Sequence, residues 1–372
     1  MKLLVLSNNN GQGHNSAATA LIESAEKRGV TGIMIDAMLF DSPRKSELFE
    51  RVHIQSALHA PQLFEKGTRL AEKLEESHRP GSESRSTRRP VERLSRFIRD
   101  NGFDTVVATH IFAAQLLTHL EERTRAPLTT AFVATDYSYT PFTSETCLDV
   151  YFLPHEKLLR DYREFAPGRN YVASGIPTSE KKLFRTEQSA ARAALELPQD
   201  RPIAVIMTGS MGFGDVVPIV GRLLEEAPDG TLVLALCGSN RKLMQTLGET
   251  FPDEAQVRPV SYTDQVGLYL DAADVLLSKP GGLSSTEAAV KEIPLVHITP
   301  LPGWEEDNVR FFTSLGLSRT GETPEAMAAE AAALLRDKAA AAQMRLCQRR
   351  EINKHAAADI LDTLTALQKA RM

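Results

Sequence analysis

The sequence has few of the features that mark membrane-spanning, disulfide-rich or nucleic-acid-binding proteins. Only three of its 372 residues are cysteine, and Cys147, Cys237 and Cys347 lie too far apart to suggest a zinc site or a disulfide framework. No apolar run reaches the roughly 18 residues that a membrane-spanning helix needs. The formal net charge of −5 argues against nucleic acid as a partner. We therefore expect a reduced, cytoplasmic protein.

Motifs of several common enzyme classes are also missing. The chain contains no Asp-x-Asp pair and no His/Asp cluster with metal-ligand spacing, so we expect no metal. No Gly-x-Ser-x-Gly elbow of a hydrolase occurs. The glycine-rich segment that ends at Gly214 lacks the lysine of a P-loop, and Ser16 replaces the last glycine of a dinucleotide fingerprint. P-loop ATPases and dinucleotide-dependent enzymes are thus disfavoured.

The sequence does contain a regular alternation of short strands and helices. Most predicted strands are continuous apolar runs, which suit a parallel sheet covered on both faces. The predicted strands are Leu3–Ser7, Gly32–Asp36, Thr105–Thr109, Thr129–Ala134, Val150–Leu153, Ile203–Met207, Thr231–Leu236, Arg258–Val260, Val275–Leu277 and Leu295–Ile298. We predict an α/β protein with two Rossmann-like, doubly wound parallel-sheet domains.

The domain boundary is expected near the turn at Gly175-Ile176-Pro177. We predict an N-terminal domain over residues 1–175 and a C-terminal domain over residues 176–372. The final stretch, Glu325–Ala370, has a helical pattern. The sequence leaves open whether its last helix packs back on the first domain.

The segment Ser278–Ala288 predicts a nucleotide site. It follows a short strand and opens a helix, and Gly281 and Gly282 let the backbone approach a ligand closely. The start of a helix offers unpaired N–H groups and a positive dipole end, which favour a diphosphate. Glu287, one turn further on, can accept both hydroxyls of a ribose. The alternative is an ordinary strand-loop-helix turn with capping serines.

Other polar loops follow predicted strands, where α/β folds bind their ligands. His14 and Asp136 could each act as a general base, or each could cap or orient a neighbouring group. Gly209–Gly214 fits a phosphate loop or a plain glycine-rich turn. Glu305 and Asn308 could hold sugar hydroxyls, although acidic residues also favour the first turn of any helix.

One region differs from the rest in charge. Arg79–Arg99 contains seven arginines and two glutamates, so its charge is +5 in a protein of −5. The preceding stretch His53–Leu70 mixes apolar and charged residues. A basic loop beside an amphipathic segment suits an anionic membrane surface. A solvated surface loop is the alternative.

Together these motifs resemble the family of monogalactosyldiacylglycerol synthases and processive diacylglycerol glucosyltransferases. These are inverting GT-B glycosyltransferases that use nucleotide sugars, and the lipid II synthase of peptidoglycan assembly is a more distant relative. Trp304 and Asn9-Asn10 depart from the residues common in the family. The matching segments are Gly11-Gln12-Gly13-His14, Thr109-His110, Thr135-Asp136, Ser174-Gly175-Ile176-Pro177, Gly209–Gly214, Lys279-Pro280-Gly281-Gly282, Thr286-Glu287-Ala288 and Pro302-Gly303-Trp304-Glu305 with Asn308.

The resemblance implies a UDP-sugar donor, a lipid acceptor, expected to be diacylglycerol, and no cofactor. It also implies a peripheral location on the inner face of the cell membrane. By the same resemblance, Glu287 holds the ribose and Tyr262 faces the uracil. His14 is the implied base or acceptor-positioning residue, with Asp136 as its rival.

The remaining implied roles fall into three groups. The residues near the diphosphate are Gly209, Ser210, Met211, Gly212, Gly281, Gly282, Leu283 and Ser284; those near the donor sugar are Gly303, Glu305 and Asn308; His110 lies toward the acceptor, and the charge of the basic segment adds Arg85, Arg88 and Arg89 toward the anionic membrane surface.

Three other functions stay open at this point. The acceptor could be linked to a polyprenyl diphosphate, the protein could be a UDP-sugar 2-epimerase, or it could bind nucleotide sugars without catalysis. The joint presence of His14, Glu287 and Glu305 favours an enzyme, because binding alone does not require all three.

Overall fold

The protein is described by a computed structural model that forms two compact units. It describes residues 1–8, 12–41, 88–124, 127–209, 215–298, 300 and 303–371. Unit 1 comprises the described part of Met1–Glu180 together with residues 303–304 and 353–371; unit 2 comprises Lys181–Pro300 and Glu305–Ile352. The contacts therefore divide the chain between Glu180 and Lys181, and the last helix belongs to unit 1.

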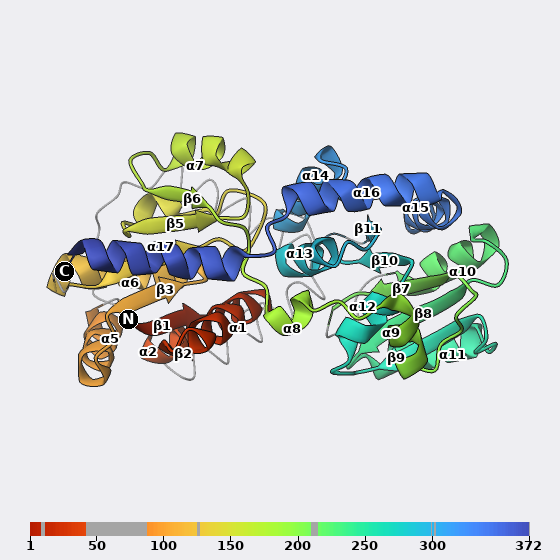
Figure 1. Cartoon of the computed structure of the whole chain (residues 1–372), viewed down its shortest axis with the longest axis horizontal. Helices are drawn as coiled ribbons and strands as arrows, with labels where there is room; N and C mark the ends of the chain where they lie inside the picture. Colours follow the sequence, from red (N-terminus) through yellow and green to blue (C-terminus); the bar gives the residue numbers. More distant parts are fainter. Residues whose placement is uncertain are drawn as a thin grey trace. The chain divides into compact units, whose positions relative to one another are not determined.

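Unit 1 is built on a six-stranded sheet in the order β2-β1-β3-β4-β5-β6 (Figure 1). All neighbouring strands are parallel, for example with Leu3 opposite both Gly32 and Thr105. The strands are β1 (Lys2–Ser7), β2 (Thr31–Asp36), β3 (Thr105–Ala108), β4 (Thr129–Val133), β5 (Val150–Leu153) and β6 (Tyr171–Ala173). Because parallel strands end at the same edge of a sheet, the loops after β1, β3 and β4 meet there.

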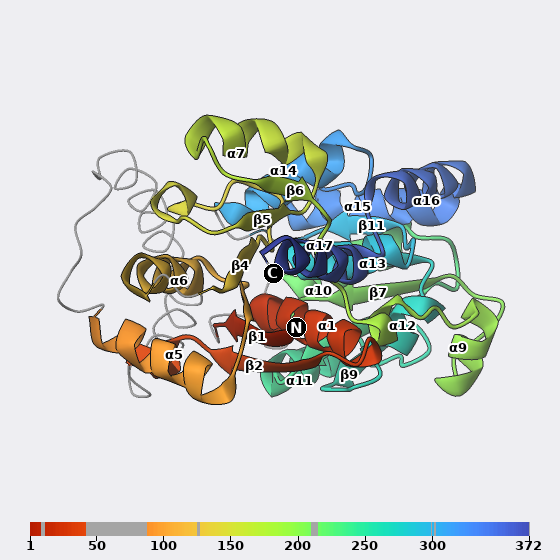
Figure 2. The same cartoon turned by 60° about the vertical axis from the view of Figure 1, so that its left-hand side comes forward.

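The helices of unit 1 cover this sheet. They are α1 (Gln12–Lys27), α2 (Met38–Asp41), α5 (Arg88–Asn101), α6 (Ile111–Thr124), α7 (Leu159–Phe165) and α17 (Ala356–Arg371), with short 3-10 turns at Thr143–Glu145 and Glu156–Leu158. Helices α5 and α6 pack side by side (Figure 2). The short α8 (Glu180–Leu183) lies at the division between the units.

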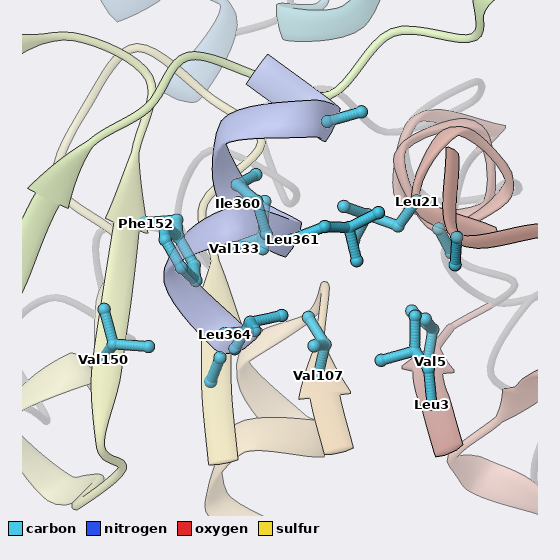
Figure 3. Close-up of a cluster of buried hydrophobic side chains, with 14 residues drawn as sticks. Leu3, Val5, Leu21, Val107, Val133, Val150, Phe152, Ile360, Leu361 and Leu364 are labelled. Carbon is cyan, nitrogen blue, oxygen red and sulfur yellow. The ribbon is translucent and has the colours of Figure 1, made fainter. Parts of the chain in front are cut away.

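Helix α17 completes the core of unit 1 although it comes from the other end of the chain. Its residues Ile360, Leu361 and Leu364 are fully buried and recur at the spacing of one helical face. They pack against Val107 and Phe152 of the sheet, together with residues of α1 (Figure 3). Ion pairs between Arg28 and Asp362 and between Arg371 and Asp149 tie the middle and the C-terminal end of the helix to the unit.

The predicted boundary motif Ser174–Pro177 lies against the start of this helix. Gly175 adopts a φ of +89°, which side chains other than glycine rarely tolerate. A Cβ atom there would lie 3.1 Å from the Cβ of Ala356 and 3.2 Å from that of Asn353. The side-chain amide of Asn353 donates to the carbonyl of Ser174 at 2.8 Å. Glycine is thus needed where the chain leaves the sheet and α17 enters.

Unit 2 is a five-stranded parallel sheet in the order β11-β10-β7-β8-β9. The strands are β7 (Ile203–Met207), β8 (Leu232–Gly238), β9 (Val257–Ser261), β10 (Val275–Ser278) and β11 (Leu295–His297), and the helices are α9 (Gln188–Ala194), α10 (Val216–Glu226), α11 (Arg241–Thr250), α12 (Val266–Ala272), α13 (Gly282–Val290), α14 (Trp304–Ser314), α15 (Pro324–Arg336) and α16 (Lys338–Glu351). A buried ion pair joins Lys291 to Asp271 at 2.6 Å, and Lys291 also donates to the carbonyl of Phe184. These bonds attach the segment around Phe184, where the chain enters unit 2, to the rest of the unit.

The predicted fold class is confirmed, since both units are parallel sheets with alternating helices. The strand β6 (Tyr171–Ala173) was not predicted. The basic segment was predicted as a loop, and this is wrong for residues 88–99, which lie in α5. Its apolar face is buried through Val91, Leu94 and Ile98. The stretch His53–Leu70 lies outside the described residues.

Candidate functional site

His14 lies near the start of α1, where it meets the ends of β3 and β4. Its Nδ1 is 2.7 Å from the carbonyl oxygen of Thr109 and 3.1 Å from Oγ1 of Thr135. A carbonyl oxygen can only accept a hydrogen bond, so Nδ1 must carry the proton. In the neutral ring Nε2 is then the unprotonated nitrogen, which is the form that a general base requires.

The surroundings of His14 favour its neutral form. Burial lowers the pKa of the imidazole below its usual 6.5, and the negative charge of Asp136 partly opposes this shift. Asp136 follows β4, and it lies close enough to His14 for its charge to affect the pKa of the ring. The structure thus brings both candidate bases together. At neutral pH the geometry suits His14 for accepting a proton from a hydroxyl.

His110 lies beside His14 but has a partner set of its own. The two rings meet edge to face with centroids 4.8 Å apart. Nδ1 of His110 accepts the backbone N–H of Phe112 at 3.2 Å and lies 3.4 Å from the amide nitrogen of Asn8. These contacts cap the start of α6 and hold His110 beside His14. His110 was predicted to face the acceptor.

In unit 2 the predicted diphosphate turn opens α13. Gly281 is extended and precedes the helix, and a Cβ atom built on it would meet no other atom within 4 Å. Gly282 and Leu283 are buried, whereas Ser284 is half-buried. Gly209, after β7, has a φ of +85° and equally open surroundings. The two turns thus leave space beside backbone N–H groups, as an anion site needs.

The two carboxylates predicted to bind the donor are each paired with a lysine. Oε1 of Glu287 lies 2.6 Å from Nζ of Lys182, and only 13% of the Glu287 side chain is exposed. Oε1 of Glu305 lies 2.8 Å from Nζ of Lys279. Neither pairing could be expected from the sequence, because the partners are far apart in the chain.

Asn308 lies deeper than the predicted role suggests. It is fully buried, and its amide donates to the carbonyl of Pro280 at 2.9 Å. This bond joins α14 to the turn before α13. Gly303, directly before α14, has a φ of +94°. Asn308 therefore braces the turn, which stabilises the position of Gly281.

His297 is a further residue that the sequence did not single out. Its Nε2 lies 3.0 Å from Oγ of Ser285 in α13, and its Nδ1 lies 3.1 Å from Oγ of Ser318. Complete burial lowers its pKa to about 3, so the ring is neutral. The bond from His297 to Ser285 thus holds α13 against β11. The signal in the sequence was only a histidine at the end of a predicted strand.

Several other predicted residues are exposed or undescribed. Tyr262 directly follows β9 and is 72% exposed, so its ring is available for stacking. Arg88 and Arg89 are exposed at the start of α5. Gly11, Ser210, Met211, Gly212 and Arg85 lie outside the described residues. In the described part of the chain, no three His, Cys, Asp or Glu residues are grouped so that they could hold a metal ion.

Comparisons with known proteins identify the family of each half of the chain. Residues 14–177 match the family model of monogalactosyldiacylglycerol (MGDG) synthase, and residues 203–364 match the C-terminal domain of glycosyltransferase family 28. A processive diacylglycerol beta-glucosyltransferase of Staphylococcus saprophyticus is 28% identical over 60% of this chain and 57% of its own length. One of the same name from Bacillus pumilus is 22% identical over 98% and 94%. The chain matches just over half the length of the staphylococcal relatives.

Solved structures show the same fold. Acinetobacter baumannii MurG has a TM-score of 0.66 at 13% identity, over 98% of this chain and 99% of that one. Anabaena HepE, solved in complex with UDP, has a TM-score of 0.60 at 12% identity, over 98% and 100%. The fold is therefore GT-B. With its two family matches, one in each half, the chain belongs to glycosyltransferase family 28 and has an N-terminal domain of the MGDG synthase type.

Proposed function

We propose that this protein transfers a hexose from a UDP-sugar to diacylglycerol at a membrane surface, with inversion and without a metal. The observation that carries the proposal is the fixed tautomer of His14, whose Nε2 can accept a proton. It lies in the half of the chain that matches MGDG synthase. The relatives named diacylglycerol beta-glucosyltransferases support the lipid acceptor and the hexose.

The reaction joins an oxygen of the acceptor to the anomeric carbon of the donor. As that bond forms, the bond from this carbon to the β-phosphate oxygen breaks, and its electron pair stays on the leaving UDP. Nε2 of His14 takes the proton of the acceptor hydroxyl. Attack from the side opposite the phosphate inverts the anomeric centre, which agrees with the word beta in the relatives' names because common nucleotide sugars are α-linked.

Unit 2 would bind the donor and stabilise the leaving group. Glu287 accepts the ribose hydroxyls and Tyr262 stacks on the uracil. The N-terminus of α13 points N–H groups and a positive dipole end at the diphosphate, where negative charge grows during the reaction. This arrangement supplies the charge stabilisation that other transferases take from a metal. HepE, a structure of the same fold, was solved with UDP, which supports the choice of nucleotide.

The membrane would be reached through α5. Its apolar residues are buried in unit 1, and the opposite face exposes Arg88, Arg89 and other arginines. Such a face attracts anionic lipid headgroups. None of the described helices is both long and apolar enough to cross a bilayer. We propose that the protein binds peripherally to the cytoplasmic face of the membrane.

Release of UDP from a panel of UDP-sugars tests this function. The assay compares diacylglycerol in anionic vesicles, the same vesicles without diacylglycerol, and both with EDTA. We expect release with one UDP-hexose, only with diacylglycerol, and undiminished by EDTA. Release that requires a polyprenyl diphosphate, or interconversion of the sugar without any lipid, would contradict the proposed acceptor or reaction. UDP binding without turnover would contradict catalysis.

A further inference from the structure

Lys279 occupies a fixed position between β10 and α13, the helix that we assign to the diphosphate. It directly follows β10, and its backbone N–H donates to the carbonyl of Met207 at 3.2 Å. Its own carbonyl accepts the N–H of Gly281 at 2.9 Å, which closes a tight turn. The backbone of Lys279 is therefore fixed by its hydrogen bonds to Met207 and Gly281. Only the four-carbon stem and the ammonium can move.

The position is electrostatically unfavourable for a lysine unless an anion is present. Lys279 comes three residues before the first residue of α13, where the helix dipole is positive. An ammonium beside that end adds to the positive potential. In the structure Glu305 balances it, with Nζ and Oε1 2.8 Å apart and both side chains mostly buried. The pair thus joins one cation and one anion at the segment that leads into α13, since Lys279 lies two residues before Gly281.

The same pair presents a difficulty for Glu305. A carboxylate close to a diphosphate repels it, and the first turn of α14 adds further acidic residues, Glu306 and Asp307. A cation between the carboxylate and the phosphates removes this repulsion. Lysine suits such a bridge, since its ammonium is a compact charge with three donors on a flexible stem. One ammonium can therefore bond a carboxylate and a phosphate together.

We propose that Lys279 is the side chain that binds the diphosphate of the donor and stabilises the leaving UDP. This inference rests on the function proposed above. Its Nζ donates to a phosphate oxygen when the donor binds, and keeps or yields its bond with Glu305. The growing negative charge on the β-phosphate oxygen, as its bond to the anomeric carbon breaks, is balanced by this ammonium together with the N-terminus of α13. Lys279 thereby takes the place of a metal cation.

The test compares binding of UDP and uridine by calorimetry. Lys279→Met removes the charge and keeps the stem, so we expect UDP affinity to fall about tenfold or more and uridine affinity to stay unchanged. Glu305→Gln releases the cation from its partner, so UDP affinity should be unchanged or tighter. Lys242→Met, an exposed lysine of α11, is the matched control and should bind both ligands like the wild type. With a UDP-sugar, Lys279→Met should lower kcat as well as raise KM.

Three results would overturn the inference. If Lys279→Met and Glu305→Gln weaken UDP equally, or if uridine is weakened as much as UDP, the lysine only holds its partner in place. UDP affinity like that of the wild type in Lys279→Met would also overturn it. Lys279→Gln repeats the test should the Met variant fold poorly, as judged by thermal unfolding. Failure of the wild type itself to bind UDP would instead remove the proposed function.

Discussion

Lys182 and Glu287 form an ion pair in unit 2, with Nζ of the lysine 2.6 Å from Oε1 of the glutamate. Lys182 belongs to α8, at the entry of the chain into the unit, and Glu287 to α13. A carboxylate has about four acceptor positions, so the ammonium leaves room for two ribose hydroxyls. The ion pair therefore holds the carboxylate in place without occupying all of its acceptor positions.

Glu287→Gln should weaken both uridine and UDP about tenfold or more, because a hydrogen bond to a charged group contributes about 1.5–3 kcal/mol. Lys182→Met should weaken both ligands by up to about fivefold, since a partly exposed ion pair contributes roughly 0.2–1 kcal/mol. Isothermal titration calorimetry measures both. Glu254→Gln, at an exposed position, is the control. Unchanged uridine binding in Glu287→Gln would show that the ribose binds elsewhere.

His14→Asn should lower kcat by about 100- to 10,000-fold, the usual contribution of general acid–base catalysis, while UDP binding stays unchanged. Steady-state transfer and UDP titration separate the two effects. Asp136→Asn should keep substantial activity. If instead Asp136→Asn abolishes transfer and His14→Asn retains it, the aspartate is the base.

The pH dependence of kcat/KM should show the same base. His14 must be neutral to act, and burial lowers its pKa below 6.5, so activity should persist below pH 6.5 and fall only in more acidic solution. The charge of Asp136 raises that pKa. Asp136→Asn should therefore shift the acid limb of the profile to lower pH. A shift to higher pH would contradict the assignment.

The burial of His297 should make stability depend on pH. Its pKa is about 3 in the folded protein and 6.5 for an exposed histidine, so the unfolded state binds the proton more readily. Its contribution is present above pH 6.5 and is lost as pH falls from there toward 3, on the order of 1 kcal/mol per pH unit. Urea unfolding at several pH values measures this slope. His297→Asn should flatten it, and an equally steep slope in the variant would contradict the cause.

Gly175→Ala should lower the free energy of unfolding by about 1–3 kcal/mol. The new methyl group would be strained at a φ of +89° and would meet Ala356 and Asn353 at the start of α17. Gly168→Ala is the matched control, because its φ is +78° but nothing lies within 4 Å of the added atom. Equal losses in the two variants would show that backbone strain alone is responsible.

Replacing Arg88 and Arg89 by glutamine should weaken binding to anionic vesicles about tenfold or more, since each basic residue near such a surface contributes about 1 kcal/mol. Vesicle sedimentation measures the binding, and added salt should weaken the wild type as well. Arg241→Gln with Lys242→Gln, exposed on α11, removes the same charge from unit 2 as a control. Equal losses in both double variants would contradict a specific role for α5.

The sequence predicted the framework of both sheets well. Most predicted strands agree with the structure within one or two residues, because short apolar runs and flanking glycines are local signals. The basic segment was misread since its arginines hide a narrow apolar face of Val91, Leu94 and Ile98. Only packing against the rest of unit 1 decides which face of α5 is buried.

By itself, the sequence determined the parallel α/β units, the turn at Gly281-Gly282 and the placement of His14 and Glu287 in helices that each follow a short strand of their own sheet. These follow from periodicity and from residue types along a few neighbouring positions. The tertiary structure alone decided the return of α17 to unit 1, the proton on Nδ1 of His14 and the pairing of Glu287 and Glu305 each with a lysine. Each depends on contacts between segments far apart in the chain, which packing creates and local pattern does not encode.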